Sequence, residues 1–229
     1  MSLPPYTAHN IELDDGTWTL PGAPPVAGNE ICRAALALLR EHVPGGGRVA
    51  DLGALEGGYA VAFARAGYQV LAVEARIRNM ARCLHTAARV DLPGLAFAHG
   101  DARSLDAYGT FDAVFCCGLL YHLDRPAEFL RMLGTVTRRL LILQTHYSVR
   151  PDAVNEGLPG HWYGEDPSEE AAWASWGNDR SFWLAEEALL DAVRAAGFSD
   201  AARYPGGVIA GTEGDRAMFT GVREVTRHG

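Results

Sequence analysis

A glycine-rich turn followed about 20 residues later by a single acid is the first part of the chain that could do chemistry. Residues 49–76 read VADLGALEGGYAVAFARAGYQVLAVEAR, in which Gly53 follows one apolar run and Glu74 ends the next. A dinucleotide would need close backbone approach where Leu55 stands, and the charge of Glu56 opposes a pyrophosphate at a helix N-terminus. Glu74 could accept hydrogen bonds from both hydroxyls of a ribose. The stretch therefore predicts a ligand with a ribose but no phosphates.

Two histidines stand where an open sheet of parallel strands binds its ligands. His122 comes just past the apolar run 111–116 and His146 just past the run 140–144, so both lie at carboxyl ends of predicted strands. Either imidazole could be the general base for an acceptor that carries a proton. The alternatives are that His122 packs under the ligand and that His146 begins the next segment. Tyr121 is expected to form a wall of the pocket, or to act as a hydrogen-bonding acid or base.

The segment 148–181 is long, polar and dotted with Pro, Gly and Trp, which inside a compact domain is typical of a lid. Four of the five tryptophans of the chain fall within residues 161–183. This aromatic density suits an apolar or aromatic acceptor, or a cation held over a ring face, although the tryptophans could instead anchor the lid to the core. The candidate substrate contacts are His146, His161, Trp162, Tyr163, Trp176 and Phe182.

A metal site is the weaker interpretation of the same segment. His161 and Glu165 could be two ligands, but the sequence places no third ligand nearby. The apolar run 111–116 leads into Cys117 and Gly118 rather than into the carboxylate that a magnesium site would need. We therefore expect no metal.

The elements that position these residues alternate between short apolar runs and helical patterns. The runs lack clean alternation, which is typical of parallel strands covered on both faces; they are 49–52, 69–73, 95–98, 111–116 and 140–144. Helices are expected at 29–42, 59–66, 78–89, from Pro126 onward and at 185–196, followed by closing strands at 201–204 and 216–223. The pattern predicts an α/β fold with a doubly wound, mostly parallel, seven-stranded sheet.

One domain over residues 1–229 accounts for the whole chain. Its expected parts are an N-terminal extension and helix (1–46), a cofactor-binding core (47–145), a lid insertion (146–183) and a closing helix with strands (184–229). Within the extension, residues 9–18 are expected either to fold over the ligand, bringing His9, Asn10 or Trp18 near it, or to form an exposed hairpin around Asp15 and Gly16.

The amino-acid composition limits the classes of binding partner that the protein is expected to have. The 20 basic and 28 acidic residues, with a pI near 5.4, disfavour nucleic acid and anionic lipid. Four cysteines without a CxxC pair indicate reduced thiols, and the chain has neither a signal-like N-terminus nor a long uncharged apolar run. We expect a cytoplasmic protein without a membrane span, and the sequence leaves monomer and homodimer open.

Four motifs together resemble the class I S-adenosylmethionine (SAM)-dependent methyltransferases. They are DLGALEGG, AVEAR, HGDARSL and FDAVFCCGLLYHLDRPAEFLRML, which follow that family in identity, order and spacing over about residues 47–145. AEEALLDAVRAAGF near the C-terminus adds weaker support. The resemblance implies a Rossmann-like methyltransferase fold, SAM as the cofactor and S-adenosylhomocysteine (SAH) as the product.

The resemblance also assigns contacts to the cofactor. Asp51 would anchor the turn, Gly53 would let the backbone approach the methionine part, and Glu74 would hold the ribose. Adenine would meet Asp101 and Ala102, and its amino group the carbonyl of Cys117. The full expected set is Asp51, Gly53, Ala54, Leu55, Glu74, Ala75, Arg76, Asp101, Ala102, Arg103, Cys117, Leu119 and His122. The family usually has a second glycine where this chain has Leu55.

The expected activity is methyl transfer to oxygen or nitrogen of a small organic acceptor, with His122, His146 and Tyr121 as candidate catalytic residues. HNIELDDGTWTLPG, CCGLLYHLDRP and GNDRSFWLAEEALLDAVRAAGF resemble bacterial small methyltransferases distantly like the tRNA wobble-uridine carboxymethyl-transferring enzymes. An RNA methyl- or carboxymethyl-transferase is therefore one alternative, and a cofactor-binding regulatory module without catalysis is another. The acidic composition favours the small molecule.

Overall fold

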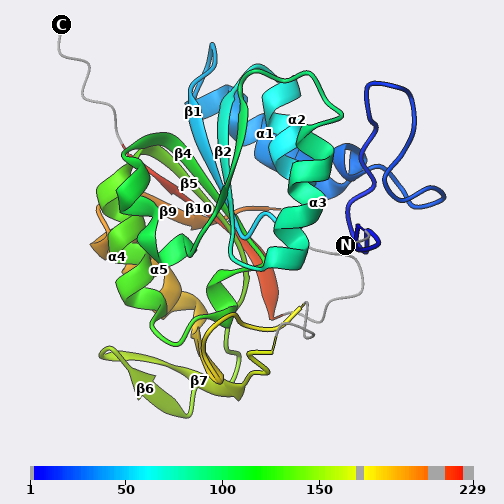
Figure 1. Ribbon diagram of the computed structural model, residues 1–229. Coiled ribbons are helices and arrows are strands. Elements are labelled where there is room, and N and C mark those ends of the chain that lie inside the picture. Colours follow the sequence, from blue (N-terminus) through cyan, green and yellow to red (C-terminus); the bar gives the residue numbers. More distant parts are fainter. Residues whose placement is uncertain (1–2, 169–172, 206–214, 224–229) are drawn as a thin grey trace, which may run out of the picture.

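A computed structural model describes residues 3–168, 173–205 and 215–223 and contains a central sheet with helices on both faces (Figure 1). The strand order is β3-β2-β1-β4-β5-β10-β9, and β10 runs antiparallel to both of its neighbours. The strands are β1 (Arg48–Leu52), β2 (Gln69–Glu74), β3 (Leu95–His99), β4 (Phe111–Cys117), β5 (Thr137–His146), β9 (Asp200–Arg203) and β10 (Arg216–Val222). The predicted fold class is confirmed.

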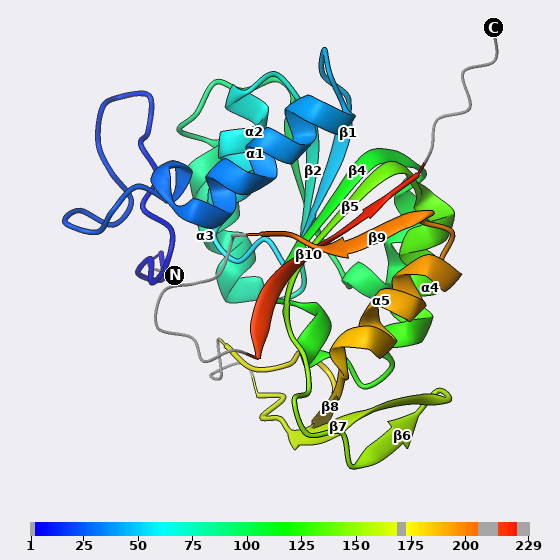
Figure 2. The same ribbon diagram turned by 180° about the vertical axis from the view of Figure 1, so that it is seen from behind.

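The helices divide between the two faces of this sheet (Figures 1 and 2). One face carries α1 (Glu30–His42), α2 (Gly58–Arg65) and α3 (Ile77–Ala87), and the other carries α4 (Pro126–Val136) and α5 (Glu186–Ala195). Sequence signals explain where two of them begin: the Asn29 side chain accepts from the N–H of Cys32, and Pro126 is the first residue of α4. Short 3-10 helices are η1 (Val26–Gly28), η2 (Ala102–Tyr108) and η3 (Leu120–His122). Among the described helices, none is long and apolar enough to cross a membrane.

The strand order places a reversal point between β1 and β4. From β1 the chain adds β2 and β3 on one side and later β4 and β5 on the other. Loops leaving the carboxyl ends of β1 and β4 therefore turn in opposite directions and leave a crevice between them, where open α/β sheets bind ligands. The glycine turn after β1 lies at this crevice, held by hydrogen bonds from the Gly53 and Ala54 N–H groups to the carbonyl of Val73.

The lid differs from the irregular segment that the sequence predicts. It folds mainly as a three-stranded antiparallel sheet in the order β6-β7-β8, with β6 (Ala153–Asn155), β7 (Leu158–Gly164) and β8 (Arg180–Leu184), beyond the carboxyl ends of the main strands (Figure 1). Glu156 and Gly157 join β6 to β7 with φ of 52° and 83°, the left-handed pair that a tight hairpin turn requires. A Cβ added at Gly160 would lie 2.2 Å from the Trp183 carbonyl oxygen. Because glycine has no Cβ, β7 can pair closely with β8 at this position.

The N-terminal extension crosses the glycine turn through Glu56. The Glu56 carboxylate is completely buried and accepts from the N–H groups of Thr7, Ala8 and His9 at 2.6, 3.1 and 2.7 Å. The Arg82 Nε lies 3.5 Å from the same carboxylate. We call residues 7–9 the N-terminal strap. Glu56, which the sequence presents only as a charge that opposes a pyrophosphate, is thus the anchor of this strap.

Both expectations for the extension are met in part. A turn around Asp15 and Gly16 is closed by a bond from the Leu13 N–H to the Thr17 carbonyl, while His9 reaches the glycine turn. Asn10 instead bonds within the extension, to the backbone of Leu20 and Ala23.

Replacing the anchor should destabilise the protein. Glu56→Gln leaves one oxygen for several N–H donors and removes the charge opposite Arg82, so the free energy of unfolding is expected to fall by about 2–4 kcal/mol. Urea unfolding measures the change, with the exposed Glu12→Gln as the matched control. A loss within about 0.5 kcal/mol of the control, the range of ordinary surface changes, would contradict the anchoring role.

Candidate functional site

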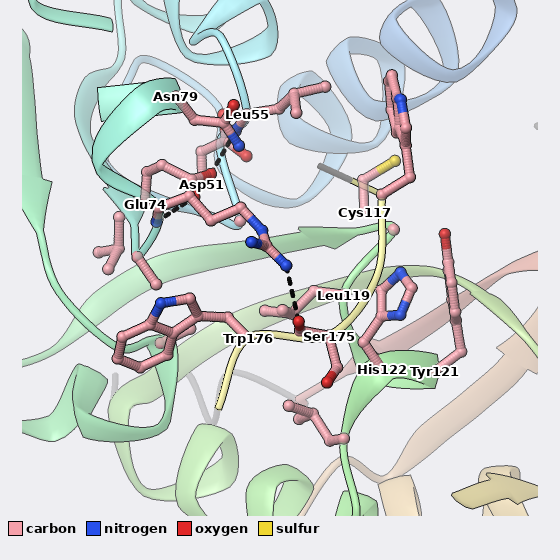
Figure 3. Close-up of a pocket in the computed structure, with 18 of the residues that line it drawn as sticks. Asp51, Leu55, Glu74, Asn79, Cys117, Leu119, Tyr121, His122, Ser175 and Trp176 are labelled. Atoms are coloured by element: carbon pink, nitrogen blue, oxygen red, sulfur yellow. Dashed lines mark hydrogen bonds between the residues drawn. The ribbon is translucent and has the colours of Figure 1, made fainter. Parts of the chain in front are cut away.

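A cavity of about 350 Å³ opens at the carboxyl ends of β1, β2 and β4, bordered by the lid and the N-terminal strap (Figure 3). Figure 3 shows Asp51, Glu74 and Asn79 on one side of it and Tyr121 and His122 on the other. Of the residues predicted to bind the cofactor, those that line it are Asp51, Gly53, Leu55, Glu74, Ala75, Arg76, Asp101, Ala102, Arg103, Cys117, Leu119 and His122. Ala54 is buried behind the turn and does not line the cavity.

Glu74 fixes the backbone on both sides of its own carboxylate. The Arg76 N–H donates to its Oε1 and the Leu55 N–H to its Oε2, each at 2.8 Å. Burial raises the pKa of Glu74, and these backbone hydrogen bonds oppose that shift. Each carboxylate oxygen can accept more than one hydrogen bond, so acceptor capacity remains for a ligand that brings hydroxyl groups into the cavity.

Leu55 keeps a conformation that glycine usually supplies. Its φ is 56°, in the left-handed region, next to Gly53 at 69° and Gly57 at 80°. Such a conformation in a residue other than glycine costs on the order of 1 kcal/mol. The bond from its N–H to Glu74 holds it there, and its side chain lines the cavity. Leu55 therefore adds a side chain to the lining of the cavity at the position where the family resemblance leads one to expect a glycine.

Asp51 is a buried carboxylate with spare acceptor capacity. It is 1% exposed, accepts from the Ala60 N–H, and its Oδ2 has no hydrogen-bond partner among the described residues. Burial raises its pKa to about 7, the Ala60 bond opposes this, and the charge of Glu74 adds to it. An unpaired buried carboxylate beside a cavity suits a ligand that carries positive charge. SAM, with its sulfonium and ammonium groups, fits that description.

His122 borders the cavity from the end of η3. Its Nδ1 lies 2.9 Å from Oε1 of Glu165, which comes from the lid. Burial lowers the pKa of His122 and the Glu165 charge opposes the shift, while Arg216 and Arg76 lower the pKa further. The centroid of the Tyr121 ring lies 4.2 Å from that of the imidazole, and Tyr121 also lines the cavity. The lowered pKa favours the neutral imidazole, which is the form that can accept a proton.

His146 is not among the residues that line the cavity. Its ring stacks on Trp183, with centroids 4.5 Å apart and planes at 19°, and meets the edge of Tyr121 at 4.7 Å. Its Nδ1 lies 3.4 Å from a carboxylate oxygen of Asp215. Burial and the charge of Arg216 lower its pKa. The stacking holds His146 in the wall behind Tyr121 rather than in the cavity.

Most of the expected substrate contacts in the lid pack against each other instead. Trp176 lines the cavity, together with Trp173, whereas His161, Trp162, Tyr163 and Phe182 do not. Tyr163 stacks on Trp183 at 3.8 Å between ring centroids, and Trp162 meets the buried Phe182 at 4.9 Å. The Trp183 Nε1 donates to the Tyr121 carbonyl at 2.8 Å. This part of the lid therefore matches the alternative in which the aromatic residues anchor it.

The two residues considered as metal ligands have separate partners. His161 Nδ1 contacts Asp152 at 2.6 Å, and Glu165 contacts His122. Within the described ranges, no three side chains of His, Cys, Asp or Glu come together as a metal site would require.

Several lining residues were outside the predicted set. They include Asn29, Tyr59, Asn79, Trp173, Ser175 and Arg216, whereas His9, which also lines the cavity, was expected near the ligand if the extension folds over it. His9 accepts from the Gly58 N–H at 3.0 Å, and burial lowers its pKa to about 4, so it is a neutral acceptor at the start of α2. Arg216 reaches the cavity because β10 pairs with β5 in a register that puts it opposite His146. That register is a tertiary feature that local sequence does not reveal.

Comparison with known proteins relates this chain to methyltransferases. A family model described as a methyltransferase domain matches residues 50–140. No curated protein matches the sequence. The N-terminal domain of EvdMO1, crystallised in the presence of SAH and D-fucose, is 26% identical, with a TM-score of 0.78 and coverage of 97% of this chain and 93% of that one.

Two further structures share the fold at lower identity. The 1,6-didemethyltoxoflavin-N1-methyltransferase of Burkholderia thailandensis, with bound 1,6-didemethyltoxoflavin and SAH, is 21% identical, with a TM-score of 0.60 and coverage of 85% and 79% of the two chains. The sugar N-methyltransferase KedS8 from Streptoalloteichus sp. ATCC 53650 is 17% identical, with a TM-score of 0.60 and coverage of 86% and 87%.

The sheet order, the cavity at its reversal point and the match to a methyltransferase domain agree with one another. Together with the likeness to a domain crystallised with SAH, they give the chain the Rossmann-like fold and the features of a SAM-dependent methyltransferase.

Proposed function

We propose that the enzyme transfers the methyl group of SAM to an oxygen or nitrogen of a small organic acceptor, with His122 as the general base. One observation carries the proposal: the imidazole of His122 lines the same cavity as Glu74, so a proton acceptor and the ribose ligand of the cofactor share one enclosure (Figure 3). His146, the other candidate base, lies outside that lining.

The cofactor end is assigned to the residues after β1, β2 and β3. Glu74 would accept the ribose hydroxyls with its remaining lone pairs, and Asp51 would face the positive charge of the methionine part. Asp101 and Ala102, at the start of η2, would meet the adenine. SAM supplies a methyl group already activated by the sulfonium, so that the enzyme mainly has to align an acceptor with it. Such alignment can contribute about 7–11 kcal/mol to lowering the barrier.

The acceptor end is assigned to His122, Tyr121 and Arg216. His122 would take the proton from the acceptor oxygen or nitrogen as the bond to the methyl carbon forms. Burial and, to a smaller extent, the charge of Arg216 lower the pKa of His122, which favours the neutral form of the proposed base. The Tyr121 ring, with the Arg216 guanidinium 5.3 Å from its centroid, would form the wall against which the acceptor packs.

The comparisons support a small acceptor. The EvdMO1 domain was crystallised in the presence of D-fucose, and the Burkholderia enzyme with 1,6-didemethyltoxoflavin. A cavity of about 350 Å³ is of the size that proteins use for small molecules. The net charge of −8 disfavours the phosphate contacts on which RNA binding depends.

Transfer of a radiolabelled methyl group from SAM to a panel of sugars, phenols, amines and bulk tRNA tests the proposal. Label is expected in a small molecule and not in tRNA. Labelling of tRNA, with steeply salt-dependent binding, would favour the RNA alternative. SAH binding without transfer to any member would point to the non-catalytic module and count against the proposal.

Removing the charge of Glu74 should weaken the binding of the cofactor. Glu74→Gln keeps one oxygen for a backbone N–H but loses the charged acceptor for the ribose, so the affinities for SAM and SAH should both fall by about 10-fold to 100-fold. Calorimetry measures both ligands, with the exposed Glu187→Gln as the control. Affinities equal to the control would contradict the ribose assignment.

The two histidines should separate in their pH profiles. Protonation removes the base, so the rate should fall as pH drops through the pKa of His122, which burial places below its ordinary value of 6.5. His122→Gln should lower the maximal rate by about 100-fold or more and flatten this acid limb, with little change in SAH affinity.

His146→Gln is the matched comparison and should keep the acid limb, and a chelator should leave the rate unchanged. Loss of the limb in His146→Gln alone would transfer the role of base to that residue. Abolition by a chelator, with recovery on adding a metal ion, would overturn a metal-free mechanism.

A further inference from the structure

We propose that Glu165 is the positioning residue for His122, and that the lid thereby supplies half of the proton-transfer pair. This inference rests on the proposed role of His122 as the base. Glu165 was considered from the sequence only as a metal ligand, whereas the structure brings it from the lid to the edge of the cavity.

Both oxygens of the Glu165 carboxylate are engaged. Oε1 lies 2.9 Å from His122 Nδ1, and Oε2 accepts from the Ser175 N–H at 2.9 Å. The backbone N–H of Glu165 donates to the carbonyl of Asp179 at 2.8 Å, which continues the pairing of β7 with β8. The side chains of Glu165 and His122 are only 9% and 16% exposed. The carboxylate is therefore held from its backbone and from Ser175 in the position that meets the imidazole.

This contact selects the tautomer that a base needs. An ionised carboxylate only accepts hydrogen bonds, so the neutral ring must carry its hydrogen on Nδ1. Nε2 then bears the free lone pair, and Nδ1 is already occupied, so Nε2 is the nitrogen left for the acceptor in the cavity that the ring lines. A carboxylate that orients a histidine in this way also stabilises the imidazolium formed when the proton is taken.

Two other histidines near the lid show why the cavity matters to the inference. His146 lies 3.4 Å from Asp215, and His161 lies 2.6 Å from Asp152. Neither imidazole lines the cavity. A contact between histidine and acid is thus common in this region, and only that of His122 combines it with access to the place where an acceptor would bind.

The lid is also tied to the backbone around His122 and to the cofactor end. Asn178 Nδ2 donates to the His122 carbonyl at 2.9 Å. The Arg76 guanidinium, two residues after Glu74, donates to the carbonyls of Ser168 at 2.8 Å and Ser175 at 2.7 Å. Ser175 therefore receives Arg76 on its carbonyl and gives its N–H to Glu165, which links the two ends of the site through a single lid residue.

The charges facing His122 fix the direction of the expected change. Glu165 raises its pKa, whereas burial, Arg216 and Arg76 lower it. Tyr121 contacts the ring as an uncharged phenol because burial raises its pKa, and His146 interacts with His122 electrostatically from behind Tyr121. Removing the Glu165 charge leaves only the lowering influences, so the pKa of His122 should fall.

Nitrogen NMR of ring-labelled histidine in the SAH-saturated protein tests the inference directly. In the wild type, His122 should carry its hydrogen on Nδ1 when neutral. Glu165→Ala should abolish this preference and lower the pKa of His122 by about one pH unit. Asp152→Asn, which removes the partner of His161 in the same lid, is the control and should change neither quantity for His122. Glu165→Gln, which preserves size, gives a second measurement of the pKa if the alanine variant does not fold.

Kinetics of labelled methyl transfer add a readout that a purely structural role would not move. In Glu165→Gln, kcat should fall by about 10-fold to 100-fold, KM should stay within about 3-fold, and the acid limb should move to lower pH. An unchanged tautomer and pKa of His122 in both Glu165 variants would overturn the inference, even where His122→Gln abolishes the acid limb. If His122→Gln itself keeps the wild-type limb, the proposed function fails instead, so the two failures are distinguishable.

Discussion

The rest of the site depends on the two hydrogen bonds that the buried Glu74 carboxylate accepts from the backbone. This carboxylate holds the N–H of Leu55 on one side and the N–H of Arg76 on the other. The first bond stabilises the left-handed residue of the turn, and the second places the residue whose guanidinium binds the lid. The lid in turn carries Glu165 to His122. One buried acid at the end of β2 is therefore connected to the turn, to the lid and, through the lid, to His122, the proposed base.

A second buried acid in the same turn, Glu56, has a different structural role. Glu56 is not among the residues that line the cavity; it binds the N-terminal strap, which brings His9 to the first N–H of α2. In dinucleotide-binding proteins that helix end is free to receive a pyrophosphate. Here the neutral imidazole of His9 accepts from the Gly58 N–H, so this donor is not free for a phosphate. The strap thus gives a structural reason for the ligand class that the sequence of the turn implies.

Local sequence patterns predicted the parts of the site that lie on consecutive residues. The apolar runs located the five parallel strands, and the motifs after β1, β2, β3 and β4 located the cofactor side of the cavity, because each motif follows its own strand. The left-handed φ of Leu55 was not foreseeable from the residue type, since leucine rarely adopts it. The lid sheet was missed because β6 has only three residues and because Pro159 and Gly160 interrupt the pattern of β7.

Local sequence patterns do not predict contacts between residues that are distant in the sequence. His122 and Glu165 are 43 residues apart and meet only through the lid. His146 was as plausible a base as His122 until the stacking on Trp183 was known. Arg216 enters the cavity through the antiparallel register of β10 with β5. In each case the deciding contact is tertiary, between residues that are distant in the sequence.

A crystal structure of the protein with SAH is the measurement that tests the central claim most directly. We expect the ribose hydroxyls within about 3.2 Å of the Glu74 carboxylate and the sulfur on the side of the cavity that His122 lines. A nucleoside bound away from Glu74, or a sulfur separated from His122 by the wall of the cavity, would contradict the claim that one cavity holds both the cofactor and the base.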